Sequence, residues 1–225
     1  DMEGSRGLGD VYKRQTYTVL GFKNLSGEFI NRSAKYTKSS HYVTGFDYSI
    51  GNAAKVSIEG FVKRYANFPI SLIDGVSLAN KGADFEILGN EAVLTNGKGE
   101  TKGLEFLFQQ KLTRNFYGIF SYTFFKSEFT DLNGNYLPSV WDSKHLSSFS
   151  GGYKLKRNWE ISSRWRFAGK TPYVPYNLED SLNNYPNMVL DYSQLGNLKV
   201  ENFSQLDIRF DKKWNQENLS INFFV

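Results

Sequence analysis

The chain has 225 residues, a formal net charge of +4 and no cysteine, so disulfide frameworks and thiolate metal sites are excluded. Lysine and arginine alternate with acidic residues and form no basic stripe, which argues against a nucleic-acid partner. No apolar run approaches the ~20 residues that a membrane-spanning helix needs. Aromatic residues make up 16% of the chain although its mean hydropathy is −0.46, and this combination suits strands with one apolar and one wet face.

The beginning of the chain carries no fold signal. Residues 1–15 show neither strand alternation nor helical periodicity, and we interpret them as a scar or a disordered end. Residues 16–225 are then the folded domain, and 17–23 is a candidate additional strand. No secretory signal is recognisable, so we expect the true start of the protein to lie upstream.

From residue 41 onward the chain repeats one unit, in which two alternating segments are joined by a tight polar turn and followed by a long polar connection. The predicted strands are 41–50, 55–66, 101–111, 116–128, 145–155, 159–169, 202–212 and 219–225. The predicted tight turns are 51–54, 113–115, 156–158 and 215–217. The predicted long loops are 67–100, 129–144 and 170–200.

The alternation also assigns faces. In a strand, every second side chain points to the same side of the sheet. The residues predicted to face lipid are Trp159, Ile161, Trp165, Phe167, Leu206, Ile208 and Phe210. The residues predicted to face a wet lumen are Glu59, Glu105, Arg164, Arg166, Asp207 and Arg209. A slip of one residue would move Arg164 and Arg166 into lipid at roughly 2–4 kcal/mol each near the midplane, so the pattern fixes the register.

The lengths of the strands and of their connections point to a membrane. Nine to thirteen residues is what a tilted strand needs to cross a bilayer, whereas soluble strands usually have about five or six. Short turns at one end and long loops at the other are typical of bacterial outer-membrane proteins. The sequence therefore predicts an all-β fold, an antiparallel up-and-down transmembrane β-barrel segment of about eight strands.

Four strings resemble the C-terminal barrel of TonB-dependent outer-membrane receptors of the Bacteroidetes type, and together they span 41–225. They begin with HYVTGFDYSIGNAAKVSIEGFVKRYANFPIS at 41–71 and GETKGLEFLFQQKLTRNFYGIFSYTFFKSEFTD at 99–131. They continue with WDSKHLSSFSGGYKLKRNWEISSRWRFAGKTPYVPY at 141–176 and LDIRFDKKW at 206–214. Gly103 followed by Glu105, Tyr122 within SYTF and the WDSKH stretch also look like that family's pattern.

The resemblance implies a function and a set of partners. Such receptors have a barrel of about twenty-two strands and a plug inside it, and a periplasmic motif couples them to the TonB complex. They import a scarce nutrient (siderophore-bound iron, a corrinoid, a glycan or a peptide) across the outer membrane of Gram-negative bacteria. This chain lacks a recognisable plug and coupling motif, so we expect it to be a fragment that lacks the plug domain and the last strands. The implied partners are outer-membrane lipid, the TonB complex through the missing plug, and a small nutrient ligand.

No catalytic residue, metal site or cofactor is predicted. His41 and His145 are the only histidines, and both begin predicted strands, where a loop or interfacial role is the ordinary one. Glu59 and Glu105 could suggest paired carboxylates for glycoside chemistry. On charged strand faces we expect them instead to line the lumen and to pair with Lys63 or Arg164.

The long loops are the predicted ligand-binding surface. The ligand-binding candidates are Phe85 in 67–100, and Tyr173, Tyr176 and Tyr185 in 170–200. Trp141 and Tyr173 are also interpreted as girdle residues at the lipid boundary. Loops diverge faster than the scaffold that carries them, so the cargo cannot be read from the sequence.

Two alternatives stay open at this point. A passive porin or a small closed barrel would need a charged constriction loop and a native end near Val225. A soluble β-sandwich lectin or adhesin module would need the apolar faces to pack against each other.

Overall fold

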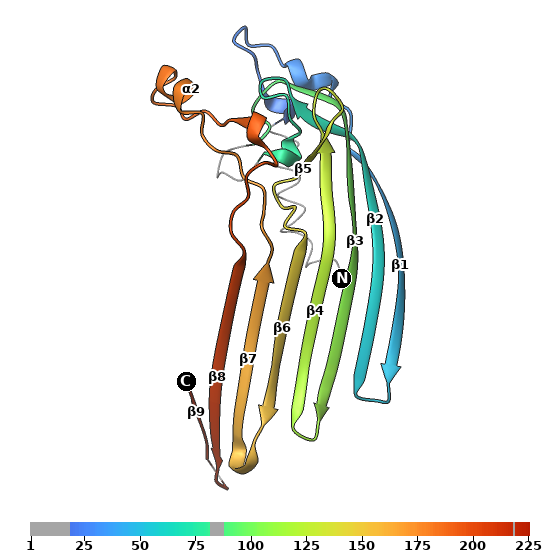
Figure 1. Cartoon of the computed structure of the whole chain (residues 1–225), viewed down its shortest axis with the longest axis vertical. Helices are drawn as coiled ribbons and strands as arrows, with labels where there is room; N and C mark the ends of the chain where they lie inside the picture. Colours follow the sequence, from blue (N-terminus) through green and yellow to red (C-terminus); the bar gives the residue numbers. More distant parts are fainter. Residues whose placement is uncertain (1–18, 82–87, 218) are drawn as a thin grey trace.

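The computed structural model describes residues 19–81, 88–217 and 219–225, and these form a nine-stranded antiparallel sheet (Figure 1). The strands are β1 (Lys38–Ile50), β2 (Ala54–Ser71), β3 (Val93–Thr113), β4 (Phe116–Thr130), β5 (Tyr136–Pro138), β6 (His145–Lys154), β7 (Trp159–Ala168), β8 (Phe203–Asn215) and β9 (Ser220–Phe224). The hydrogen-bonded order is β1-β2-β3-β4-β6-β7-β8-β9, and the short β5 pairs with β4. Each long strand thus pairs with its neighbours along the chain, which is the up-and-down topology that the sequence predicts.

Short helical segments lie outside the strands, mostly in the connections between them. They are the 3₁₀ turns η2 (Ile30–Ser33), η3 (Leu78–Asn80), η4 (Lys156–Asn158) and η5 (Tyr192–Gln194), and the helix α2 (Leu178–Asn183). Among the described residues, no helix has both the length and the apolarity that crossing a membrane requires.

The two ends of the sheet differ. The turns that join β1 to β2, β3 to β4, β6 to β7 and β8 to β9 lie together at one end, and the long connections lie at the other (Figure 1). Tight hairpins favour residues with positive φ, and Gly51, Arg114, Arg157 and Asn158 all adopt it. The predicted asymmetry between a turn end and a loop end is therefore confirmed.

Two strands are much longer than the alternation predicts. β2 has 18 residues and β3 has 21, so 67–71 and 93–100, which were predicted as loop, belong to the sheet. The polar stretch 93–100 alternates poorly, and it becomes a strand because its backbone pairs with β2 and, from Gly99 on, also with β4. The connection between β2 and β3 is thus 72–92. The predicted extra strand near 17–23 is wrong in its described part, because residues 19–23 form no strand.

The buried apolar residues gather at the loop end rather than between two layers. Ile70, Ala79 and Phe129 are each only 2% exposed. Phe129 also contacts the rings of Phe68 and Trp141. Farther toward the turns the sheet is a single layer, and large apolar side chains on the described strands are exposed.

One glycine shows how the small core is built. Gly99 of β3 lies opposite Phe129 of β4, and a Cβ atom at Gly99 would lie 2.4 Å from the phenyl ring. The ring of Phe129 therefore rests directly over the β3 backbone, which only glycine permits.

Candidate functional site

The strand register sorts the side chains of the sheet into two faces. Residues that pair directly across antiparallel strands point to the same side. From β1 to β8, one continuous set of pairs links aromatic and aliphatic residues, and we call this side the apolar face. Its central members are Phe46, Ile58, Phe106, Tyr122, Leu104, Phe124, Phe120, Phe149, Trp165 and Leu206. The opposite side, with Glu59, Glu105, Ser121, Ser148, Arg166 and Gln205 in its cross-strand pairs, is the polar face.

All seven residues that the sequence assigns to lipid share the apolar face. Ile161 lies opposite Phe210, Trp165 opposite Leu206, and the remaining three follow by alternation: Trp159, Phe167 and Ile208. Leu206 is 59% exposed and Ile208 is 55% exposed, so no described part of the chain covers this surface. The geometry thus places these seven side chains together, and contact with lipid remains a proposal.

All six residues that the sequence assigns to a lumen share the polar face. Glu59 lies directly opposite Glu105, and Arg164 lies opposite Asp207. Arg166 donates a hydrogen bond of 2.6 Å to Gln205 Oε1, and Arg209 pairs with Asp211 at 2.7 Å.

One expectation about these charges is wrong. The sequence suggested that Glu59 and Glu105 pair with Lys63 or Arg164, but the register sets Lys63 opposite Thr101 and Arg164 opposite Asp207. Within the described residues the two glutamates form no ion pair and instead face each other. Alternation along a strand identifies a face, but only the pairing across strands identifies the neighbour.

The two histidines lie on opposite faces and cannot form one site. His41 lies opposite Lys63 on the polar face, and His145 lies opposite Phe124 on the apolar face. Nδ1 of His145 lies 2.8 Å from the Tyr122 hydroxyl. The described residues contain no group of three His, Asp or Glu side chains that could hold a metal ion.

The loop that joins β7 to β8 carries three of the four predicted ligand contacts. Tyr173, Tyr176 and Tyr185 are 37%, 47% and 85% exposed, so each is free to meet a ligand. The loop is held by backbone hydrogen bonds, among them Asp191 N to Pro175 O at 2.8 Å. Along the chain, Tyr173 and Tyr176 precede α2 and Tyr185 follows it. The fourth candidate, Phe85, lies outside the described residues.

Trp141 does not have the girdle position that the sequence suggested. Its ring packs edge-on against Phe129, and Phe129 lies on the polar face at the loop end. Next to it, Asp142 is buried and its carboxylate accepts a 2.8 Å hydrogen bond from Ser127 N. Burial raises the pKa of Asp142 above its ordinary value, although that hydrogen bond acts in the other direction. The WDSKH stretch therefore ties the end of β4 to the chain that enters β6.

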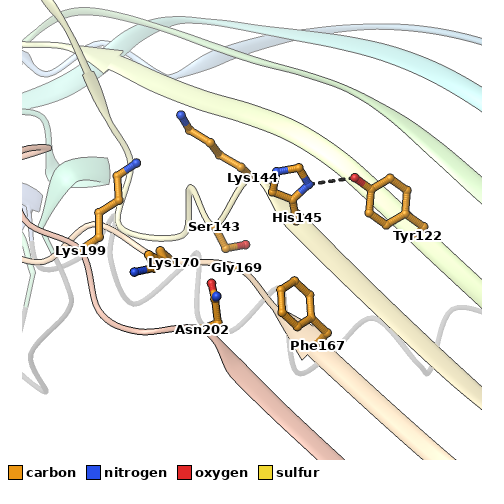
Figure 2. Close-up of a pocket in the computed structure, with 9 residues that line it drawn as sticks. All are labelled: Tyr122, Ser143, Lys144, His145, Phe167, Gly169, Lys170, Lys199 and Asn202. Carbon is orange, nitrogen blue, oxygen red and sulfur yellow. Dashed lines mark hydrogen bonds between the residues drawn. The ribbon is translucent and has the colours of Figure 1, made fainter.

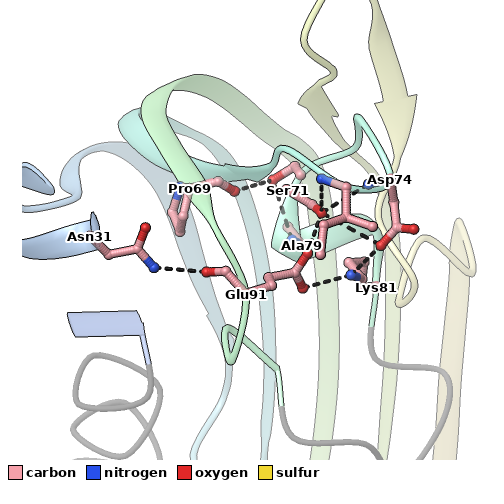
Figure 3. A network of polar contacts seen from close by, with 9 residues as sticks. Asn31, Pro69, Ser71, Asp74, Ala79, Lys81 and Glu91 are labelled. Carbon is pink, nitrogen blue, oxygen red and sulfur yellow. Dashed lines mark hydrogen bonds and ion pairs between the residues drawn. The ribbon is translucent and has the colours of Figure 1, made fainter. Parts of the chain in front are cut away.

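A buried polar cluster at the loop end could not be found from the sequence (Figure 3). Lys81 Nζ lies 2.6 Å from Glu91 Oε1 and also pairs with Asp74. The Ser71 hydroxyl donates to Glu91, and Asn31 Nδ2 donates to the Glu91 carbonyl at 2.7 Å. These residues are separated by up to 60 positions, and the only local signal is the Asp74-Gly75 turn.

The cluster keeps a lysine charged while it is largely buried. Burial lowers the pKa of Lys81, but hydrogen bonds from its ammonium to Asp74 and Glu91 outweigh this, so the pKa lies above its ordinary value. The ammonium also lies 5.6 Å from the ring centroid of Tyr192. Lys81 thus links the β2–β3 loop to the β7–β8 loop, and it stabilises the shape of the loop end.

A second polar feature lies at the loop end of the apolar face (Figure 2). Lys144, Lys170 and Lys199 line one open hollow together with the rings of Tyr122 and Phe167. In Figure 2 the lysines lie toward the loops and the two rings toward the strands. We call this hollow the lysine pocket.

The sheet and its two faces define the class of the protein: the chain is part of a β-barrel wall with one apolar surface and one polar surface. The family described as "TonB dependent receptor-like, beta-barrel" matches residues 5–225. The chain therefore belongs to the TonB-dependent receptor β-barrel family, as the sequence motifs suggested.

Solved structures agree in fold. The ferripyoverdine receptor of the outer membrane of Pseudomonas aeruginosa shares 17% identity at a TM-score of 0.56, over 89% of this chain and 24% of that one. The ferric-catecholate import receptor Fiu of Escherichia coli K12 shares 13% identity at a TM-score of 0.58, over 88% and 24%. The FrpB iron transporter of Neisseria meningitidis shares 15% identity at a TM-score of 0.54, over 85% and 27%.

The chain thus spans about a quarter of the length of these three structures. No curated protein matches it. A single sheet with an uncovered apolar face excludes the β-sandwich alternative for the described residues, and the family assignment favours a receptor over a passive porin.

Proposed function

We propose that this chain forms part of the barrel wall and the extracellular loops of a receptor that imports a scarce nutrient across the outer membrane with energy from TonB. The observation that carries the proposal is an unbroken row of apolar cross-strand pairs from Tyr48 of β1 to Leu206 of β8, in a chain of the TonB-dependent receptor β-barrel family. The receptor performs no chemistry on its ligand.

The apolar face meets lipid in this proposal. On β4, the alternate residues from Phe116 to Phe124 belong to this face. Eight residue-to-residue steps of ~3.4 Å, in a strand tilted by about 40° from the membrane normal, cover ~21 Å of membrane thickness, close to the ~25 Å apolar band of such barrels. The backbone of every strand must find partners in lipid, so the free edges of β1 and β9 pair with further strands of a larger barrel.

The polar face meets the lumen. Glu59, Glu105, Arg164, Arg166, Asp207 and Arg209 then line a wet interior, where their charges stay hydrated or contact a plug domain carried elsewhere in the protein. TonB acts through that plug and not through the strands described here. The segment 1–15, which we expected to be separate from the barrel, lies outside the described residues, and 16–225 contribute part of the barrel domain in this proposal.

The ligand first meets the loops. Tyr173, Tyr176, Tyr185 and Phe85 are our candidates for its contacts, because exposed tyrosines stack on sugar rings and cover planar iron chelates. The three solved receptors above are named for ferripyoverdine, ferric catecholate and iron. A ferric siderophore is therefore the first ligand to test, followed by corrinoids, glycans and peptides.

The experiment is nutrient-limited growth of a strain that carries the intact receptor gene. Each ligand class is offered as the only source of iron, cobalamin, carbon or amino acids, and growth is compared with a strain that lacks TonB. One class should support growth only when the receptor and TonB are both present. Growth that persists without TonB would identify a passive pore and refute the proposal.

A further inference from the structure

We propose that the lysine pocket binds the phosphate of an anionic lipid headgroup on the outer wall of the barrel. This inference rests on the proposed function, because it needs the apolar face to meet lipid.

The pocket lies on the apolar face at its loop-end boundary. Gly169 donates its N–H to the His145 carbonyl at 2.7 Å, which continues the β6–β7 pairing by one residue beyond Leu146 and Ala168. By alternation, His145 and Gly169 share the face of Tyr122 and Phe167. The floor of the pocket therefore lies in the row of Phe124 and His145, one row beyond Tyr122 and Phe167 toward the loops.

Gly169 allows the segment before β6 to pass close to the floor of the pocket. A Cβ atom there would lie 2.3 Å from the Ser143 carbonyl oxygen, so the chain before β6 runs directly over this glycine. Lys144, the next residue, adopts φ +62°, a conformation that glycine or asparagine would adopt with less strain. A lysine in that conformation brings its side chain to the pocket at a local conformational cost.

The charge of the pocket is positive. Lys170 is the one lysine of the three with an ion pair, 3.1 Å from Glu201. Lys144 and Lys199 form no ion pair with any described residue, and the nearest acid along the chain to Lys144 is the buried Asp142. Two ammonium groups are therefore available for an anion at the edge of a surface that is otherwise aromatic.

This order of groups fits a lipid better than a free anion. From the middle of the sheet toward the loops, the apolar face presents aromatic and aliphatic side chains such as Phe149 and Leu206, then the rings of Tyr122 and Phe167, and then the lysines. Figure 2 shows the two rings and the lysines in this order. Acyl chains, the polar boundary and headgroup phosphates of a membrane leaflet follow the same order. A free phosphate on its way through the barrel would instead meet the polar face.

The test uses the intact receptor in lipid nanodiscs and three probes: a diphosphorylated glucosamine acyl lipid, its dephosphorylated form, and inorganic phosphate. Lipid that stays bound is counted by native mass spectrometry. The test variant is Lys144→Ala/Lys199→Ala. The matched control is Lys111→Ala/Lys156→Ala, which removes two exposed lysines at the turn end of the sheet.

A lysine near a membrane surface contributes about fivefold in affinity, so the test variant should bind the phosphorylated lipid about 25-fold more weakly and the control should bind it normally. Removing the phosphates should weaken binding to the unaltered receptor and change little for the test variant. Equal binding of the phosphorylated lipid by the test variant would overturn the inference, as would equal binding of the dephosphorylated lipid. Displacement of the lipid by inorganic phosphate would overturn the lipid assignment.

The same samples separate this inference from the proposed function. Both variants should fractionate with the outer membrane, show heat-dependent gel mobility and support nutrient uptake. If they do and the lipid result is negative, only the lysine pocket is refuted. If the unaltered receptor does not reside in the outer membrane, the proposed function fails first.

Discussion

Placing an arginine on each side of one strand tests which face meets lipid. Phe120 and Ser121 are neighbours on β4, and they lie at the same depth on opposite faces of the sheet. Phe120 lies opposite Phe108 and Phe149 on the apolar face, at the centre of the Phe116–Phe124 band. Ser121 lies opposite Leu107 and Ser148, with no charged residue directly beside it.

An arginine on the lipid side near the midplane costs about 2–4 kcal/mol, a factor of roughly 30 to 900 in a folding equilibrium. Phe120→Arg should lose this amount in addition to the contact between Phe120 and Phe106, whose ring centroids are 6.2 Å apart. Phe120→Ala measures the loss of the ring alone. Ser121→Arg adds its charge to the wet side and should cost less than Phe120→Arg by at least 2 kcal/mol.

The assay is urea-dependent folding of the intact receptor into lipid vesicles, followed by heat-dependent gel mobility. Phe120→Arg should shift the midpoint to much lower urea than Phe120→Ala, and Ser121→Arg should stay near the unaltered receptor. Equal damage by both arginines, or a larger effect of Ser121→Arg, would refute the assignment of the faces.

Three further predictions concern the loop end. Lys81→Met leaves Asp74 and Glu91 without their buried cation, so we expect a loss of about 3–5 kcal/mol in local stability and faster proteolysis within 72–92. The pKa of Lys81 is raised in the folded state, so the stability that its charge provides is fully present below the ordinary lysine pKa of 10.5 and is lost only as pH rises above that value. The rate at which the unaltered protein is cleaved should therefore not change from pH 6 to 9. Asp142→Ala leaves the buried Ser127 N–H without its acceptor and should cost about 1–3 kcal/mol of stability. Asp142→Asn keeps an acceptor for that N–H and removes a charge that burial disfavours, so only the alanine variant should melt at a lower temperature. Gly99→Ala should cost about 1–3 kcal/mol by displacing the Phe129 ring, and Gly60→Ala, whose Cβ would meet only Leu104 at 3.4 Å, should melt close to the unaltered protein.

The sequence predicted the faces and the topology because both follow from local patterns. Alternation is strict in Leu206–Phe210, and in Trp159–Phe167 only Ser163 interrupts the apolar side. The tight turns are marked by polar residues. The upper parts of β2 and β3 were missed because the stretch 93–100 has no such contrast between its two sides. There the strand exists because neighbouring backbones pair with it, and a pattern search along one segment cannot see this.

The pairings across the sheet needed the structure. That Glu59 faces Glu105, and that Lys81 joins Asp74 and Glu91, depends on register and on contacts between distant segments. The lysine pocket could not be predicted from the sequence either, because Lys144 and Lys199 come from two different loops. They line one pocket only because β6, β7 and β8 are neighbours in the sheet.

The most direct measurement is a scan of β8 by spin labels in the intact receptor in lipid, for which no native cysteine has to be replaced within this chain. Single cysteines at Leu206, Asp207, Ile208, Arg209 and Phe210 would each carry a label, and collision rates with oxygen and with a water-soluble nickel complex would be recorded. We predict that oxygen reaches 206, 208 and 210 best while the nickel complex reaches 207 and 209 best, with a period of two residues. Equal access of the nickel complex to all five positions, or the reverse phase, would contradict the placement of the sheet in a membrane.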